Sequence, residues 1–303
     1  MASSTRAFDD NDQDSAERTR SRRAGWRKVP LFVWVSTAFV VVVALAAICA
    51  PLVSPYDPVQ QSLRERLKSP TWFPEAGQRR HLLGTDQLGR DTLSRIIYGS
   101  RVSLVVGFAA VVIGGAIGGS LGLLSGYAGG IVDEIIMLVV DAQLAFPFIL
   151  LAIGIIAALG PSFGNLIIIV GLSGWVTYAR LVRAQVLTIK EREYVLAIRG
   201  LGGSTFRILA NHIVPNTMAP FLVIITLELA RTILLESTLS FLGLGIQPPT
   251  PSWGGMLNEG RGYLDTAWWI SAFPGLILML TALVVSRVGD WLRDILDPTL
   301  RGV

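Results

Sequence analysis

The chain has 303 residues, of which 51% are hydrophobic and 16% are charged, and its formal net charge is +4. Soluble globular domains are usually about 25% charged, so this composition excludes an ordinary soluble protein. The apolar residues gather in runs near the length of about 20 residues that a helix needs to cross a bilayer. We therefore predict an all-α polytopic membrane protein with six transmembrane helices, at about residues 31–53, 102–125, 135–159, 162–179, 217–242 and 268–288.

The segment before the first run, residues 1–28, mixes acidic and basic side chains with few apolar ones, which predicts a disordered tail. The first run is too long for the apolar core of a signal peptide, so a transmembrane helix is favoured there. Seven basic residues in the tail indicate a cytoplasmic N-terminus. Six crossings then return the C-terminus to the cytoplasm, and residues 29–303 form one transmembrane domain.

Residues 54–101 would be an external segment on this topology. The segment carries eight basic residues, which is unusual outside the cytoplasm, although long segments follow the positive-inside rule poorly. From about Arg90 it can form a helix with Leu93, Ile96 and Ile97 on one face. That pattern predicts an interfacial helix at the outer membrane surface.

Glycines recur every four residues in the second run, within GGAIGGSLGLLSGYAGG. This spacing lines them along one helical face, where the backbone of a neighbouring helix can approach closely. A role in lining a pathway is the lesser alternative. We predict helix packing at Gly114, Gly118, Gly122 and Gly126.

Charged side chains inside the predicted spans are costly in lipid and are usually paired or functional. Glu228 and Arg231 are three residues apart on one helical face, so they either pair with each other or line a water-filled route. Asp141 and Glu236 have no evident local partner, and either cap polar groups of a neighbouring helix or face a polar cavity. A proline should also kink the third span. The candidate pathway residues are Asp141, Phe146, Pro147, Glu228, Arg231 and Glu236.

Residues 188–216 form a basic stretch on the cytoplasmic side, between the fourth and fifth runs. Two short helices are predicted, separated at Gly202-Gly203, because glycine supports the backbone reversal at a helix C-terminus. Ser204 can cap the second helix. The bent pair can dock into a groove on another protein or lie on the membrane surface, and the residues alone leave both open. The apolar positions at helical spacing are Tyr194, Val195, Ile198 and Leu201, then Phe206, Leu209 and Ile213.

The motifs of enzyme chemistry are missing. None of the three lysines follows a glycine, so there is no GxxxxGK[ST] loop to cradle the phosphates of ATP. His81 and His212 lie in different parts of the predicted topology, so neither a histidine metal site nor a Ser-His-Asp set is expected. We expect no catalytic residue, cofactor or metal on this chain.

Several stretches, in this order, resemble one family of transport proteins: HLLGTDQLGRDTLSRIIYGSRVSL (81–104), LAFPFILLAI (144–153), YVLAIRGLGGS (194–204), HIVPN (212–216), ESTLSFLGLGIQPPTPSWGGML (236–257) and DPTLRG (297–302). They are similar to the "C"-type permease subunits of dipeptide, oligopeptide and nickel ABC importers, which are binding-protein-dependent inner membrane components. The resemblance covers about residues 30–303.

A cytoplasmic loop of this family reads Glu-Ala-Ala, three residues, Gly, and about a dozen residues to Pro. Aligned on Gly202, the Glu-Ala-Ala positions hold Leu196, Ala197 and Ile198. The glutamate is therefore absent, and only Ala197, Gly202 and Pro215 match. Members of this subfamily commonly lack that glutamate.

The resemblance implies a type I ABC importer permease of six spans, whose loop at 188–216 is a coupling loop docking on a separate ATPase. MgATP would then be bound and hydrolysed on partner chains. The expected partners are a second homologous permease, two ATPase domains and an external solute-binding protein, which would touch residues 54–101 and Gln247–Trp253. The residues implied in coupling are Leu196, Ala197, Ile198, Leu201, Gly202, Gly203, Ser204 and Pro215.

The expected function is import of di- and oligopeptides across a bacterial plasma membrane, because the stretches match that branch. Nickel chelates or other ligands are alternatives within the same importer type. Outside it, an ion-coupled secondary transporter would use Asp141, Glu228 or Glu236, and a membrane scaffold would move no solute. No nucleic acid is expected as a partner.

Overall fold

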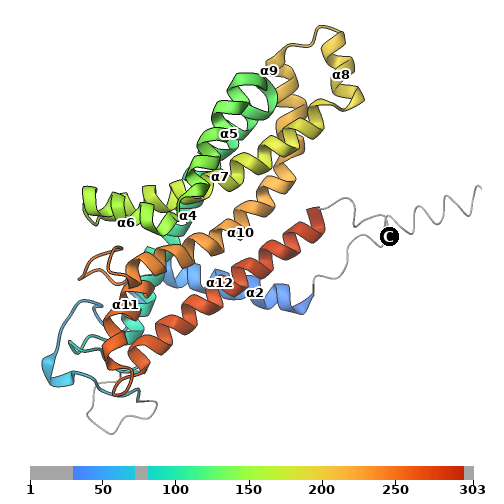
Figure 1. Ribbon diagram of the computed structural model, residues 1–303. Coiled ribbons are helices and arrows are strands. Elements are labelled where there is room, and N and C mark those ends of the chain that lie inside the picture. The colour runs from blue at the N-terminus through green and yellow to red at the C-terminus, as the bar shows by residue number, and fades with distance from the viewer. Residues whose placement is uncertain (1–29, 72–80, 297–303) are drawn as a thin grey trace, which may run out of the picture.

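The structure, a computed structural model, describes residues 30–71 and 81–296. Every named element within these ranges is a helix, which confirms the predicted all-α class (Figure 1). The tail predicted at residues 1–28 and the DPTLRG stretch lie outside the described residues.

The helices fall into two groups by length. The longer ones are α2 (Leu31–Ile48), α4 (Thr92–Ala128), α5 (Gly130–Ala145), α6 (Phe148–Leu159), α7 (Phe163–Lys190), α10 (Val214–Phe241) and α12 (Trp269–Leu296). The shorter ones are α3 (Ala50–Val53), η1 (Leu63–Glu65), α8 (Glu193–Gly200), α9 (Thr205–Ile208), η2 (Leu209–Ile213), α11 (Trp253–Gly260) and η3 (Arg261–Tyr263).

Five helical segments in the described part of the chain are long and apolar enough to cross a membrane: α2, α4, α7, α12 and the rod from α9 through α10. The predicted third span is instead divided into α5 and α6, which meet at an angle of 89° (Figure 1). Pro147 is the N-cap of α6, and Phe146 before it is extended. A proline disfavours helical geometry in the preceding residue, so the break falls there. The pair adds a sixth span only if both helices count as one.

The helix predicted from about Arg90 begins at Thr92 and continues without interruption into the second apolar run, so that α4 has 37 residues. Its place at the outer membrane surface stays a prediction. Asp91 caps it, because its carboxylate accepts a hydrogen bond from the Ser94 amide at 2.8 Å. The polar first turns can continue into the apolar run because Asp86 and Glu259 neutralise the charge of Arg95.

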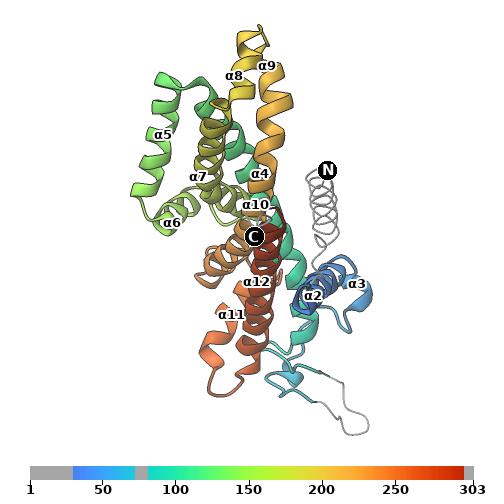
Figure 2. The same ribbon diagram turned by 90° about the vertical axis from the view of Figure 1, so that its right-hand side faces the viewer.

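α4 and α7 lie side by side in both views of the molecule (Figures 1 and 2). A Cβ atom at Gly118 would collide with the carbonyl oxygen of Trp175, and one at Gly122 with that of Ala179. The same stripe continues toward α7 at Gly114 and Gly126, where a Cβ would meet the Gly171 carbonyl and the Val186 side chain. The two backbones therefore approach more closely than any side chain on this face would permit.

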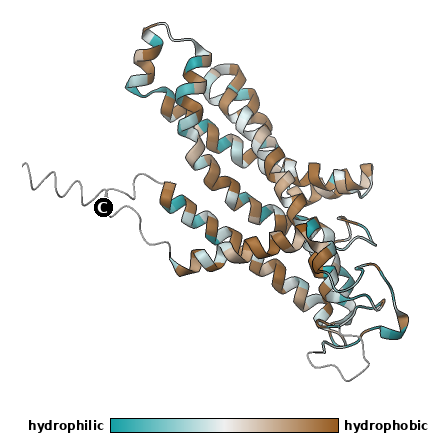
Figure 3. Ribbon diagram, turned by 180° about the vertical axis from the view of Figure 1, so that it is seen from behind, coloured by the Kyte–Doolittle hydropathy of each residue, from teal (hydrophilic) through white to brown (hydrophobic). Residues whose placement is uncertain are grey.

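The two ends of the bundle differ in character. Figure 1 places α8 and α9 at one end, here called the α8 end, and η1 with the long loop before α4 at the opposite end, the η1 end. Most residues of the helices between the two ends are apolar, while hydrophilic residues gather in the loops of the η1 end (Figure 3).

Candidate functional site

A sharp turn joins α8 to α9 at the α8 end of the molecule. The Leu201 amide donates to the Ala197 carbonyl at 3.0 Å, and the Gly203 amide donates to the Ile198 carbonyl at 2.9 Å. Gly202 has φ +83°, which L-residues with side chains rarely adopt. The Ser204 hydroxyl then accepts a hydrogen bond from the Arg207 amide and begins α9.

One side of this turn rests on the bundle. Val195, Ile208 and Ile213 are buried against Val182 and Val186 near the C-terminal end of α7. The expectation of one apolar stripe through Phe206, Leu209 and Ile213 is wrong, because Phe206 is exposed while Ile213 is buried. The π-helical turn η2 lies between them and shifts the helical register.

The other side of the turn carries apolar side chains without cover. Leu201 is 89% exposed and Phe206 is 80% exposed. Among the other predicted coupling residues, Leu196, Ala197 and Pro215 are exposed and Ile198 is partly buried. The residues from α8 to η2, here called the knuckle, thus form a fixed support with an apolar tip, which is a surface suited to a groove on a partner.

A cluster of one ion pair and two further hydrogen bonds holds the neighbouring helix ends together. Arg183 on α7 donates to both carboxylate oxygens of Asp133 on α5, at 2.5 and 2.6 Å. Ser125 on α4 donates to the same carboxylate, and Lys190 donates to the Gly126 carbonyl at 2.9 Å. The sequence analysis missed this cluster because its members are far apart along the chain.

The four charged pathway candidates, Asp141, Glu228, Arg231 and Glu236, all have partners, but they do not form one site. Arg231 donates to both oxygens of Glu228, at 3.2 and 3.1 Å. Asp141 accepts from Arg180 of α7 at 2.6 Å, a partner that sequence spacing could not reveal. This second pair is open to the surroundings, with side-chain exposures of 65% for Asp141 and 52% for Arg180. Among the described residues, Asp141 forms no hydrogen bond with either glutamate of α10.

Glu236 is fully buried, and three serine hydroxyls donate to its carboxylate. The distances are 2.9 Å from Ser103 on α4, 3.2 Å from Ser237 and 2.7 Å from Ser240. Ser240 lies four residues along the same helix, so helical spacing could have revealed this local partner. The contacts join α4 to the end of α10, and Glu236 faces no opening.

A second ion network occupies the η1 end. Arg95 on α4 donates to Glu259 on α11 at 2.7 and 3.1 Å, and it also donates to Asp86. Arg90 donates to the same two carboxylates, each at 2.6 Å. Burial alone would raise the pKa of Glu259, but the hydrogen bonds and charge of Arg95, with the charge of Arg90, hold it below its ordinary value.

The loop before α11 only partly fits the expected external contact at Gln247–Trp253. Gln247 to Thr250 are exposed, whereas Trp253 is fully buried and its indole donates to the Ile96 carbonyl at 3.1 Å. Trp253 therefore anchors α11 on α4 and cannot meet a partner.

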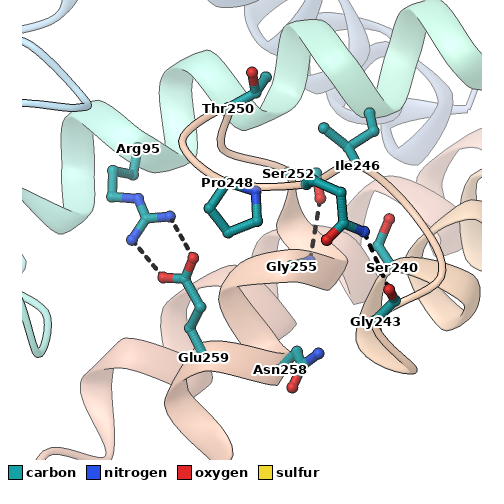
Figure 4. Close-up of a pocket in the computed structure, with 11 residues that line it drawn as sticks. Arg95, Ser240, Gly243, Ile246, Pro248, Thr250, Ser252, Gly255, Asn258 and Glu259 are labelled. Atoms are coloured by element: carbon teal, nitrogen blue, oxygen red, sulfur yellow. Dashed lines mark hydrogen bonds and ion pairs between the residues drawn. The ribbon is translucent and has the colours of Figure 1, made fainter. Parts of the chain in front are cut away.

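A small pocket of about 70 Å³ lies between this loop, Arg95 and α11 (Figure 4). It is lined by Pro248, Ser240, Asn258 and Glu259 among others. Sites for drug-sized ligands usually exceed about 300 Å³, so this pocket has room for a few waters and not for a peptide. Within the described ranges, no three His, Cys, Asp or Glu side chains are placed to hold a metal ion.

Two family models match the chain. Residues 118–302 match the binding-protein-dependent transport system inner membrane component, and residues 32–70 match the N-terminal transmembrane domain of oligopeptide transport permease C. These matches confirm the family resemblance seen in the sequence.

Characterised relatives are similar over nearly their whole length. The di/tripeptide transport system permease protein of Pseudomonas aeruginosa (strain UCBPP-PA14) is 45% identical over 263 residues, covering 87% of this chain and 86% of that protein. The dipeptide transport system permease protein of Escherichia coli (strain K12) is 45% identical over 267 residues, covering 88% and 89%. That of Haemophilus influenzae (strain ATCC 51907 / DSM 11121 / KW20 / Rd) is 42% identical over 267 residues, covering 88% and 90%. This chain therefore belongs to the family of binding-protein-dependent transport system inner membrane components.

Proposed function

We propose that this chain is a permease subunit of an ATP-driven importer of di- and oligopeptides. In the assembled importer it crosses the membrane six times, with α5 and α6 counted as one broken span and both termini in the cytoplasm. A second permease completes the pathway, two ATPase domains bind at the knuckle, and a solute-binding protein delivers peptide at the η1 end. The peptide substrate is proposed because the similar permeases of P. aeruginosa and E. coli carry di/tripeptide and dipeptide in their names.

The knuckle is the observation that carries the ATPase part of the proposal. Leu201 and Phe206 are large apolar side chains held in solvent by a turn whose other side is buried. Such exposed anchors indicate a binding surface for another protein. Because the chain lacks a GxxxxGK[ST] loop, MgATP would be bound and hydrolysed on this partner. Closure of the two ATPase domains would then move the knuckle.

The exposed ion pair between Asp141 and Arg180 supports a water-filled pathway beside α5 and α7. A charged pair in contact with lipid would be costly, so this face would border water or a second subunit. Phe146 and Pro147, at the break between α5 and α6, remain pathway candidates, as does Arg231 on α10. Glu228 and Glu236 are buried, which favours structural pairing for both.

Affinity purification of the wild-type chain in gentle detergent, with mass spectrometry of the bound proteins, tests this function. We expect a second permease and one or two ATPases. A parallel purification of Leu201→Asp/Phe206→Asp should keep the permease and lose the ATPases, because the two substitutions change only the exposed tip. A wild-type chain that purifies alone and transports solute with an ion gradient in liposomes would contradict the proposal.

A further inference from the structure

A basic surface projects from the η1 end. Residues 64–68, with the sequence RERLK, are here called the outer basic loop. Arg64, Arg66 and Lys68 are all exposed in it, next to the exposed apolar side chain of Leu63. Figure 1 shows the η1 turn, which overlaps this loop, at the tip of the molecule opposite α8.

The outer basic loop has a fixed backbone. Leu67 has φ +54°, a left-handed conformation that costs about 1 kcal/mol or more for a residue with a side chain. Its side chain packs on the cluster of Ala267, Trp269 and Ile270 at the start of α12. Leu67 lies between the exposed bases Arg66 and Lys68, and its own side chain turns toward the bundle. Such backbone strain persists only where surrounding contacts enforce it.

Thr85 supplies most of those contacts. Its hydroxyl accepts from the Lys68 amide at 2.8 Å and donates to the Glu65 carbonyl at 2.5 Å. Its own amide donates to the Lys68 carbonyl at 3.0 Å, and the indole of Trp269 donates to the Thr85 carbonyl at 3.1 Å. The basic side chains therefore start from a preorganised backbone, which lowers the entropy lost on binding.

The acidic residues of the same region point inward. Asp86 pairs with Arg90 and Arg95, and the Asp91 carboxylate lies 2.8 Å from the ring of His81 and caps α4. Glu65 is partly buried and contacts His81 and Lys68. Among the described acids of residues 54–91, only Asp57 is exposed, so bases outnumber acids on the outward side of this segment; Asp265, in the loop before α12, is a further exposed acid of this end.

We propose that the outer basic loop binds clustered carboxylates on the surface of the solute-binding protein. This inference rests on the proposed function, which supplies a soluble partner at the η1 end. Arginine side chains recognise carboxylates with paired hydrogen bonds, and complementary charge speeds the encounter of two proteins. A protein partner is favoured over lipid because the loop lies at the tip of the molecule, among the hydrophilic loops of the η1 end and away from the apolar middle of the helices (Figures 1 and 3).

The test uses the whole complex in nanodiscs of zwitterionic phosphatidylcholine, with the solute-binding protein that stimulates ATP hydrolysis by the wild type. We expect Arg64→Gln/Arg66→Gln to raise the half-saturating concentration of that protein about tenfold at low salt. Arg261→Gln removes an exposed base of η3 outside the loop and should change the concentration less than about twofold. The difference should shrink in about 0.5 M salt, because salt screens exposed charges.

An unchanged half-saturating concentration in the double variant would overturn the inference. So would a defect that appears only when anionic lipid is added to the nanodiscs, since the loop would then serve lipid. Binding of a labelled oligoglutamate peptide to the same nanodiscs separates the two proposals. Equal binding by wild type and double variant overturns this inference, whereas loop-dependent binding without any stimulated ATP hydrolysis contradicts the proposed function alone.

Discussion

Glu236 is held by hydroxyl groups and not by a cation, so its neighbours lose their acceptor if it is removed. Glu236→Ala leaves the hydroxyls of Ser103, Ser237 and Ser240 without this partner, and we expect a loss of about 3 kcal/mol in stability. Glu236→Gln keeps the shape and one acceptor oxygen and should lose about 1 kcal/mol. Thermal unfolding of the purified complex measures both. An alanine variant that is as stable as wild type but inactive would assign Glu236 to the pathway.

Gly118 can be compared with a glycine three residues away on the same helix. A Cβ at Gly118 would overlap the Trp175 carbonyl, whereas at Gly115 the nearest atom would be a Phe221 ring carbon at 3.5 Å. Gly118→Ala should therefore destabilise the chain by about 1–3 kcal/mol through overpacking. Gly115→Ala should be neutral or stabilise it by up to about 1 kcal/mol, because alanine favours helix. Equal unfolding temperatures for the two variants would contradict the close approach of α4 and α7.

At Gly202 in the knuckle, the effect of backbone strain can be measured separately from the effect of an added side chain. Gly202 has a left-handed φ, but a side chain there would enter open space. Gly202→Ala should cost about 1 kcal/mol and preserve transport, since only the backbone is strained. Gly202→Trp adds bulk beside Leu201, and we expect peptide uptake per ATP hydrolysed to fall at least about tenfold with the permease still inserted. Uptake in the tryptophan variant equal to that of the alanine variant would exclude this surface as the coupling contact.

The contact between α11 and α4 should weaken in acid. Glu259 has a pKa below its ordinary value of 4.5 in the folded chain, so its pairing stabilises the fold at pH above about 4.5. That stabilisation is lost as the pH falls through the lowered folded value. We expect the protection of the α11 amides, measured relative to their intrinsic exchange rate at each pH, to fall below pH 4.5 in the wild type. In Glu259→Gln the α11 amides should be less protected than in the wild type at pH 7, and the protection of the two proteins should converge near pH 3. A difference in protection that is the same at every pH would contradict the role of the ion pair.

Helix positions could be predicted from apolar runs, because burial in lipid sets both their length and their composition. The boundaries failed where tertiary contacts neutralise polar groups. The predicted second span began at residue 102, but α4 begins at Thr92, and the charge of Arg95 in its first turn is paired with Glu259, 164 residues away. Pro147 indicated a bend, although not that it would reach 89°.

In the candidate sites too, contacts between residues close in sequence could be predicted, whereas contacts between distant residues could not. Pairs at helical spacing, such as Glu228 and Arg231, could be proposed from the sequence alone. Asp141 looked unpaired because Arg180 is 39 residues along the chain. The knuckle was predictable as two capped helices, but which apolar residues face outward depends on the π-helical turn at η2 and on packing against α7.

At the scale of the whole molecule, the knuckle and the outer basic loop should lie on opposite sides of the membrane. Cys49 is the only cysteine, so Cys49→Ser gives a background without thiols. On this background, Arg64→Cys should react with an impermeant maleimide on spheroplasts, and Leu201→Cys only on inverted vesicles. Both positions are exposed on this chain, so when it is expressed without the ATPases and the solute-binding protein, access from one side of the membrane decides the labelling.

Val195→Cys is the matched control, because Val195 is buried beside the knuckle and should react from neither side. Labelling of Arg64→Cys and Leu201→Cys from the same side would mean an even number of crossings between them. That outcome would make α5 and α6 a re-entrant pair and not a broken span, since α2 precedes both positions and only α4, α7 and the α5–α6 pair lie between them. Labelling from opposite sides requires the pair to cross, and with α2, α10 and α12 this gives six spans.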